Sequence, residues 1–147
     1  MIVPIIRDLL VQALLGVVAT LGFAVWFNLP RKSLVRAGAV GAGGYIVRFL
    51  LLNVGQPPFV ASFWAAFVVG LAGFRLTALR YPRVMFTVTG IIPLVPGIPA
   101  YQALVYLSKG NVLSGLESSL RATLIIASLS AGLTVARAIT MLKARKA

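Results

Sequence analysis

Cysteine and histidine are absent from the 147-residue chain, and the only acidic residues are Asp8 and Glu117. The first two absences exclude disulfide bonds, thiolate chemistry and most transition-metal sites. They also remove the usual base that would activate a serine or threonine nucleophile, and no Gly-rich phosphate-binding loop sequence is present. We therefore expect neither an enzyme nor a protein that depends on a cofactor or a metal.

Charge is scarce as well: 11% of the residues are charged and 60% are hydrophobic, with a mean hydropathy of +1.00. A soluble domain carries charge on about a quarter of its residues. The apolar residues form long runs, which predicts an all-α, polytopic membrane protein. The net charge is +12, but the basic residues lie at the ends of apolar runs rather than on one polar face, so we do not expect a nucleic-acid partner.

Five apolar runs are long enough to cross a bilayer, and segments that contain Pro or Gly with polar residues separate them. The predicted spans cover about residues 6–27, 33–53, 59–79, 84–108 and 116–141, and residues 1–147 form a single transmembrane domain. The connecting segments are short, so neighbouring spans should form antiparallel hairpins.

Basic residues predict the orientation of these spans, because Lys and Arg are in excess in cytoplasmic loops. One side receives ten of them: Arg31, Lys32, Arg36, Arg75, Arg80, Arg83, Arg137, Lys143, Arg145 and Lys146. The other side receives four: Arg7, Arg48, Lys109 and Arg121. We therefore expect the first loop, the third loop and the C-terminus in the cytoplasm, and the N-terminus outside.

The fourth span contains Pro93, Pro96, Gly97 and Pro99 near its middle. Each proline lacks an N–H and displaces the carbonyl four residues earlier, so a continuous helix is not expected. The freed acceptors would be the carbonyls of Thr89, Ile92 and Val95. The sequence predicts two half-helices that meet inside the membrane, as at the substrate sites of many transporters. The alternative is a proline-kinked helix that serves only the shape of the bundle.

The second half-helix would supply hydrogen-bond donors. Gly97 would turn the chain with a positive φ, and Pro99 would occupy the first helical position. The N–H groups of Ala100, Tyr101 and Gln102 would then face the break, where a helix N-terminus favours a carboxylate. A small amino or hydroxy acid would match these groups. The predicted substrate-binding residues are Thr89, Ile92, Pro93, Pro96, Gly97, Pro99, Ala100, Tyr101, Gln102 and, from the second span, Arg48.

Two other features remain open to more than one interpretation. Arg48 and Arg121 lie inside the outer ends of their spans and would either snorkel to the surface or form an electropositive vestibule. Glu117 is also spaced to pair with Arg121 on a helix. Small residues four apart, such as Ala66 and Gly70, predict close helix contacts, either within the bundle or with another subunit.

An ordered set of motifs runs from about Gly22 to the end of the fourth span. It comprises Gly22-Phe23-Ala24 with Phe27-Asn28-x-Pro30, Arg48 before an apolar run, Ser62 through Val69-Gly70, Tyr81-Pro82-Arg83-Val84-Met85-Phe86-Thr87-Val88, and Ile92-Pro93-x-x-Pro96-Gly97-x-x-Ala100-Tyr101. With these residues the chain resembles the small, all-membrane subunit of the split threonine/serine exporter family. The last motif is the most specific, whereas the first twenty residues and the fifth span match only in hydropathy.

The resemblance implies an exporter of threonine, serine or similar small carboxylates in the bacterial cytoplasmic (inner) membrane, driven by the proton-motive force. It also implies a larger partner subunit of the same family, related to this chain as an inverted repeat. Neither acidic residue is expected at mid-membrane depth, so a proton site is expected on the partner. The alternatives are a non-transporting scaffold that stabilises a partner transporter, and a small homo-oligomeric channel.

Overall fold

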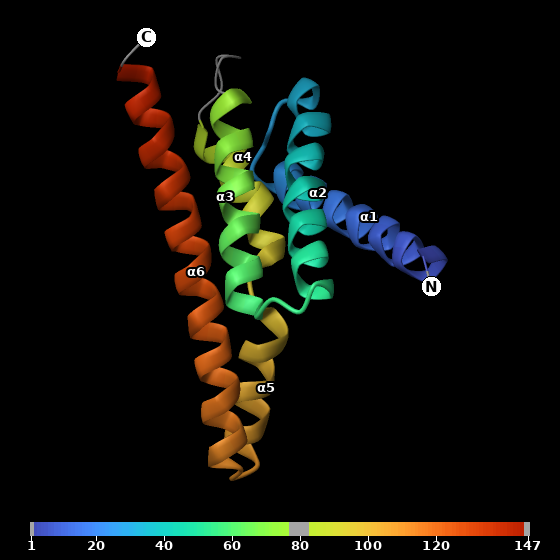
Figure 1. The fold of residues 1–147 in the computed structure, drawn as a ribbon, viewed down its shortest axis with the longest axis vertical. Coiled ribbons are helices and arrows are strands. Elements are labelled where there is room, and N and C mark those ends of the chain that lie inside the picture. The colour runs from blue at the N-terminus through green and yellow to red at the C-terminus, as the bar shows by residue number, and fades with distance from the viewer. Residues whose placement is uncertain (1, 77–82, 146–147) are drawn as a thin grey trace.

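The computed structural model describes the chain except residues 1, 77–82 and 146–147 (Figure 1). Its elements are α1 (Ile2–Trp26), α2 (Arg31–Asn53), α3 (Pro58–Leu76), α4 (Arg83–Ile91), the short 3-10 helix η2 (Ile92–Leu94), α5 (Gly97–Ser108) and α6 (Val112–Arg145). Within the described residues all regular structure is helical, which confirms the predicted all-α class.

Four segments are long and apolar enough to cross a membrane: Arg7–Trp26, Arg31–Asn53, Pro58–Arg75 and Val112–Leu142. A fifth is obtained if the bent pair Phe86–Leu94 and Gly97–Ser108 forms one span. The chain is therefore a polytopic helical membrane protein. The span predicted over 84–108 corresponds to α4, η2 and α5, and the span predicted over about 116–141 lies within α6 (Val112–Arg145). The predicted loop residues 80–82 lie outside the described residues.

Residues with positive φ end three of the helices. They are Asn28 (φ 59°) after α1, Gly55 (φ 86°) after α2 and Gly110 (φ 77°) after α5. In each case the next N–H reaches back into the last turn, as in the 2.9 Å bond from Asn111 to the Tyr106 carbonyl, which satisfies carbonyls that the helix end leaves free. These turns reverse the chain, which gives the antiparallel hairpins that the short connections predicted.

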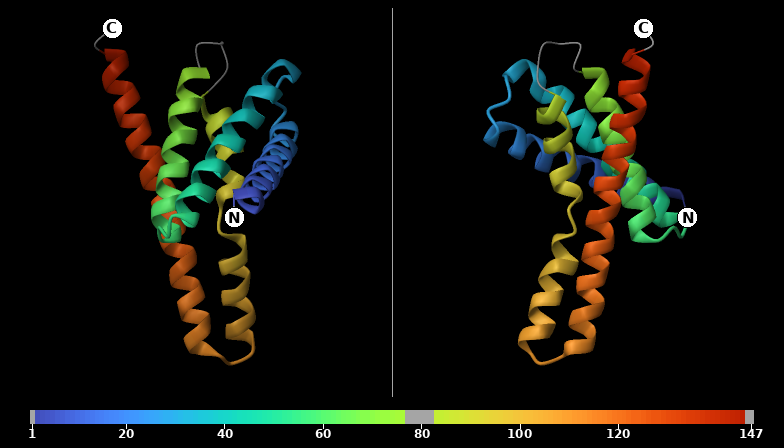
Figure 2. Two further views of the ribbon diagram at one scale, coloured as in Figure 1. Left: turned by 45° about the vertical axis from the view of Figure 1, so that its right-hand side comes forward. Right: turned by 90° about the vertical axis from the view of Figure 1, so that its left-hand side faces the viewer.

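Helix α6 runs along the whole length of the molecule and the other helices are arranged beside it (Figure 1). Its C-terminal half packs on α3, which contacts α2, and α2 contacts α1. Helix α4 lies between α2 and α3, whereas α5 packs on the N-terminal half of α6. In both views of Figure 2, α5 and that half of α6 extend beyond the ends of α2 and α3. The α4–α5 break therefore lies where the multi-helix bundle gives way to a two-helix arm.

Small residues hold the bundle helices in close contact. Ala65, Ala66 and Val69 of α3 are fully buried, and a Cβ added at Gly70 would lie 2.6 Å from the Cβ of Ala136 on α6. Gly41 similarly meets the side chain of Thr20 on α1. The small-residue pattern thus serves packing within this chain, which supports the first of its two interpretations.

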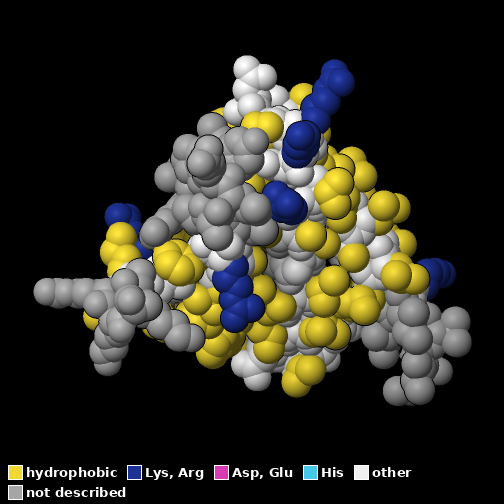
Figure 3. All heavy atoms as spheres, turned by 90° about the horizontal axis from the view of Figure 1, so that it is seen from above, with side chains coloured by type: hydrophobic (Ala, Val, Ile, Leu, Met, Phe, Trp, Pro, Cys, Tyr) yellow, Lys and Arg dark blue, Asp and Glu magenta, His cyan; other side chains and the backbone are white. Residues whose placement is uncertain are grey.

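The segments predicted to be cytoplasmic lie at one end of the molecule. The α1–α2 turn, the end of α3 and the C-terminal end of α6 are all at the top of Figure 1. Seen from above, this end displays Lys and Arg side chains and, among the described residues, no acidic ones (Figure 3). The clustering agrees with the charge asymmetry used to predict the orientation.

Candidate functional site: the break between α4 and α5

The helix that begins at Arg83 stops at Ile91 and resumes only at Gly97. Between them, η2 forms one tight turn, Val95 is extended (φ −60°, ψ 136°) and Pro96 has φ −77° and ψ 67°. The flanking helical segments Phe86–Leu94 and Gly97–Ser108 meet at 45°. The segments before and after the break are both helical. Because they meet at 45°, the break bends the chain without reversing it.

Several backbone groups at the break bond to one another. The Val95 N–H donates to the Ile92 carbonyl (3.1 Å), and the Gly97 N–H donates to the Val95 carbonyl (2.8 Å). The expectation that these two carbonyls would be left without a donor is therefore wrong, because the tight turn supplies donors that a continuous α-helix would place elsewhere. Two further carbonyls, those of Pro93 and Leu94, accept hydrogen bonds from side chains of α2.

The α2 side chains are those of Tyr45 and Arg48, which are three positions apart and so share a helix face. The Tyr45 hydroxyl donates to the Pro93 carbonyl at 2.7 Å, and Arg48 Nη1 donates to the Leu94 carbonyl at 3.1 Å. Leu94 itself is fully buried in the core cluster with Val69 of α3. Two side-chain bonds and one buried apolar anchor therefore fix the first half of the break to α2 and α3.

Arg48 keeps hydrogen-bonding capacity that the described residues do not use. Its Nε atom is buried and has no hydrogen-bond partner among the described residues. The two acidic side chains are both engaged elsewhere, Asp8 with Arg7 (3.2 Å) and Glu117 with Arg121 (2.7 Å). Neither acid of the sequence therefore neutralises Arg48, and a partly buried cation without a carboxylate partner is suited to bind an anion. Arg48 is partly buried and donates to the break, whereas Arg121 is exposed and forms its predicted pair.

The start of α5 differs from the prediction. The helix begins at Gly97, two residues before Pro99, and the Ala100 N–H donates to the Pro96 carbonyl at 3.2 Å rather than pointing into the break. Positive φ in the described glycines is confined to Gly55 and Gly110, so Gly97 does not turn the chain in the predicted way. The bend instead comes from Pro96. Its ring restricts φ, which is −77°, and its ψ of 67° is not helical, so α5 leaves in a different direction from α4.

The predicted site residues fall into two groups. Thr89 and Pro96 are buried, and the Thr89 hydroxyl donates to the Phe86 carbonyl at 3.3 Å. Gly97, Ala100, Tyr101 and Gln102 are exposed on the arm, and Ile92, Pro93 and Pro99 are partly buried. The structure thus connects Arg48 to the break but places Tyr101 and Gln102 on an outer face.

Tyr45 is the residue that the sequence interpretation missed. It carries no charge and lies in an apolar span, so its residue type gave no signal. Its bond to Pro93 joins residues 48 positions apart, which only the packing of α2 against the break brings together. The spacing of Tyr45 and Arg48 on one helix face was the available clue. Together the two donors place a hydroxyl and a guanidinium directly beside the break.

Comparison with known proteins identifies the family of the chain. Residues 12–139 match the family described as Threonine/Serine exporter, ThrE. An uncharacterized protein of Haemophilus influenzae is 38% identical over 99 residues, which are 66% of this chain and 33% of that protein. The chain thus matches about a third of the length of this curated relative. No solved structure matches the chain. Because the family match covers most of its length, the chain belongs to the threonine/serine exporter family.

Proposed function

We propose that this chain is one subunit of a secondary-active exporter of small amino or carboxylic acids, with threonine or serine as representative substrates. Membership of an exporter family supports transport, and the long apolar helices support a multi-pass position in the bacterial cytoplasmic membrane. The observation that carries the proposal is the partly buried guanidinium of Arg48 beside the α4–α5 break, whose buried Nε has no hydrogen-bond partner among the described residues. A cation at a break in a membrane helix is suited to hold a small carboxylate.

In this proposal the substrate carboxylate exchanges with the Leu94 carbonyl at Arg48. A charged acceptor forms a hydrogen bond about twice as strong as a neutral one, so the carboxylate can displace a backbone oxygen. Once Arg48 leaves Leu94, the joint at Val95 and Pro96 loses one of its two ties to α2. The half-helix α5 then changes its angle to α4. Tyr101 and Gln102 on its exposed face contact the amino or hydroxyl group during this movement.

A larger subunit of the same family completes the transporter in the proposal. The two acidic side chains of this chain are already paired with arginines, so the group that couples transport to protons belongs to the partner. The N-terminus lies outside and the C-terminus in the cytoplasm, and a partner of opposite orientation gives an inverted repeat. The 33% coverage of the Haemophilus influenzae relative leaves ample length there for a second membrane unit.

A scaffold function is the second candidate, and one specific observation favours it. Both α2 donors already bond carbonyls of this chain, so holding a fixed kink would be a sufficient role for Tyr45 and Arg48. In that case the partner alone would carry substrate. The two functions differ in whether changes on the open side of the break affect transport.

The test is counterflow of labelled threonine, serine and a dicarboxylate by the complex with its larger subunit. A Cβ at Gly97 meets nothing within 4 Å, and the same holds for Gly43 of α2, so Gly97→Leu and the control Gly43→Leu start from equally open positions. We expect Gly97→Leu and Gln102→Ala to lower export at least tenfold while the complex still assembles. Export that stays normal in both variants would leave only the scaffold function.

A further inference from the structure

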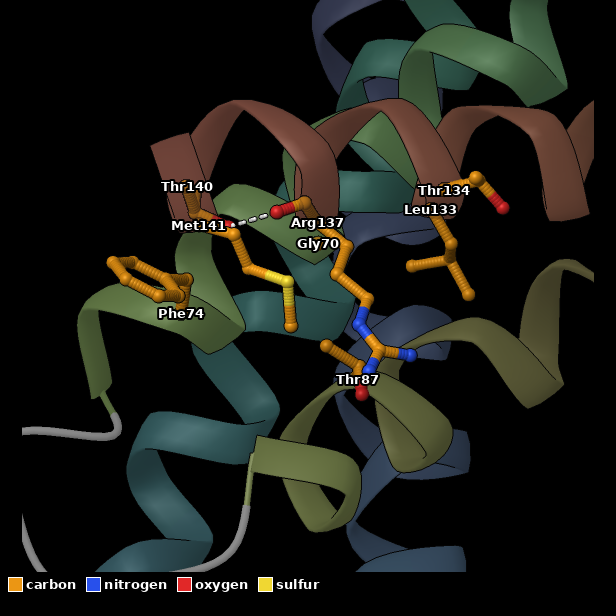
Figure 4. A pocket seen from close by; sticks show the side chains of 8 residues that line it. All are labelled: Gly70, Phe74, Thr87, Leu133, Thr134, Arg137, Thr140 and Met141. Atoms are coloured by element: carbon orange, nitrogen blue, oxygen red, sulfur yellow. Dashed lines mark hydrogen bonds between the residues drawn. The ribbon is translucent and has the colours of Figure 1, made fainter. Parts of the chain in front are cut away.

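A second hollow lies at the opposite end of α4, between α3, α4 and α6 (Figure 4). Its volume is about 340 Å³, within the range of about 300–1,000 Å³ that small-molecule sites occupy. Phe74, Leu133 and Met141 contribute apolar walls, and Thr87 and Thr140 contribute hydroxyl groups. The hollow therefore combines apolar surface with a few polar groups, as binding sites for small metabolites do.

Arg137 is the one charged side chain among the described residues that line this hollow. It extends from α6 across the cleft, and its guanidinium lies toward Thr87 of α4 (Figure 4). The two acids of the sequence are held by Arg7 and Arg121, so neither is its counterion. The one hydroxyl hydrogen of Thr140 is shared between the backbone carbonyls of Ala136 and Arg137, so a ligand could use this hydroxyl only as an acceptor.

Close helix contacts define the floor of the cleft. A Cβ at Gly73 would lie 2.6 Å from Cγ2 of Thr87, so α3 and α4 touch directly beside the hollow. A Cβ at Gly70 would likewise lie 2.6 Å from that of Ala136 on α6. These two contacts set how closely α4 and α6 each approach α3, and the hollow lies between them.

We infer that the Arg137 cleft is a second substrate site, which binds the carboxylate of the transported acid on the side predicted to face the cytoplasm. The inference rests on the proposed export function and adds a second binding site to the transport path. Thr87 and Leu94 are seven positions apart on α4 and η2, so the two arginine sites are separated by about 10 Å along this helix. An acid captured at Arg137 has a short path along α4 to Arg48 at the break.

The test uses the complex with its larger subunit in proteoliposomes, with threonine as the probe added to either face. Arg137→Gln should raise the half-saturating concentration about tenfold or more when substrate is added to the face where Arg137 lies, and less than twofold from the other face. Arg137→Lys keeps the charge and should restore much of the affinity. Arg75→Gln is the matched control, because Arg75 is exposed at the same end and lines a different hollow.

The possible outcomes distinguish failure of the proposed Arg137 site from failure of the proposed export function. Normal transport with Arg137→Gln indistinguishable from Arg75→Gln would overturn the cleft site and leave the exporter intact. Absence of threonine, serine and dicarboxylate transport in the unmodified complex would overturn the export function itself. The same titrations in zwitterionic vesicles and in vesicles with added phosphatidylglycerol distinguish a lipid phosphate. An Arg137 effect that appears only with phosphatidylglycerol would show that the cleft holds a headgroup and would also overturn the proposal.

Discussion

Tyr45→Phe should loosen the α4–α5 break while leaving the size of the side chain almost unchanged. The variant removes the hydroxyl that donates to the Pro93 carbonyl at 2.7 Å. In an α-helix that carbonyl would accept from the N–H of residue 97, but the Gly97 N–H donates to the Val95 carbonyl at 2.8 Å. Tyr45 therefore supplies a bond for which the neighbouring turn offers no replacement.

The expected loss of stability follows from this single bond. Hydrogen bonds between membrane helices average about 0.6 kcal/mol and reach about 1.7 kcal/mol. Because Tyr45 is partly buried, we expect the loss to lie between these two values, at about 1 kcal/mol, or roughly a fivefold shift in the unfolding equilibrium. Combining Tyr45→Phe with Arg48→Met should show a coupling energy of at least about 0.5 kcal/mol, since both donors hold successive carbonyls of one turn.

Unfolding in mixed micelles measures this free energy, and Tyr106→Phe is the control, because Tyr106 is exposed on α5. The absence of cysteine allows spin labels to be placed freely, for example at Val35 of α2 and Leu104 of α5, which are both well exposed. We expect Tyr45→Phe to broaden the distance distribution between these labels. An unfolding free energy and a distribution as unaffected as those of Tyr106→Phe would refute the idea that Tyr45 holds the break.

Three further predictions address packing, surface charge and orientation. Gly70→Ala should destabilise the protein by about 1–3 kcal/mol, because its Cβ would lie 2.6 Å from that of Ala136. Gly43→Ala, which has open space around it, should not destabilise the protein. Equal unfolding free energies for the two variants would contradict the packing described. Arg121→Gln should cost no more than about 0.5 kcal/mol by the same assay, because its pair with Glu117 is exposed, and a larger loss would give it a role beyond the pair. A reporter fused to the C-terminus should be active only as a cytoplasmic fusion, and an external signal would disprove both the orientation and the inverted-repeat partner.

Local sequence determined the helical class, most helix ends and the position of the break. Long uncharged apolar runs require helices in a bilayer, and Asn28, Gly55 and Gly110 end helices because their conformations suit a left-handed turn. Pro93 and Pro96 interrupt the interior of a helix, since a missing N–H is a property of the residue itself. These features depend on neighbours along the chain, and the family motifs lie in the same segments.

Tertiary structure alone decided which groups meet at the break and what else lies beside α4. Sequence rules assigned the free carbonyls by counting four residues back from each proline, but the tight turn at η2 rearranged the donors. The bonds from Tyr45 and Arg48 join residues 48 and 46 positions apart, and the Arg137 cleft joins three helices. Such contacts depend on how closely small residues let helices approach, which is settled by packing between helices and not by the chain's local preferences.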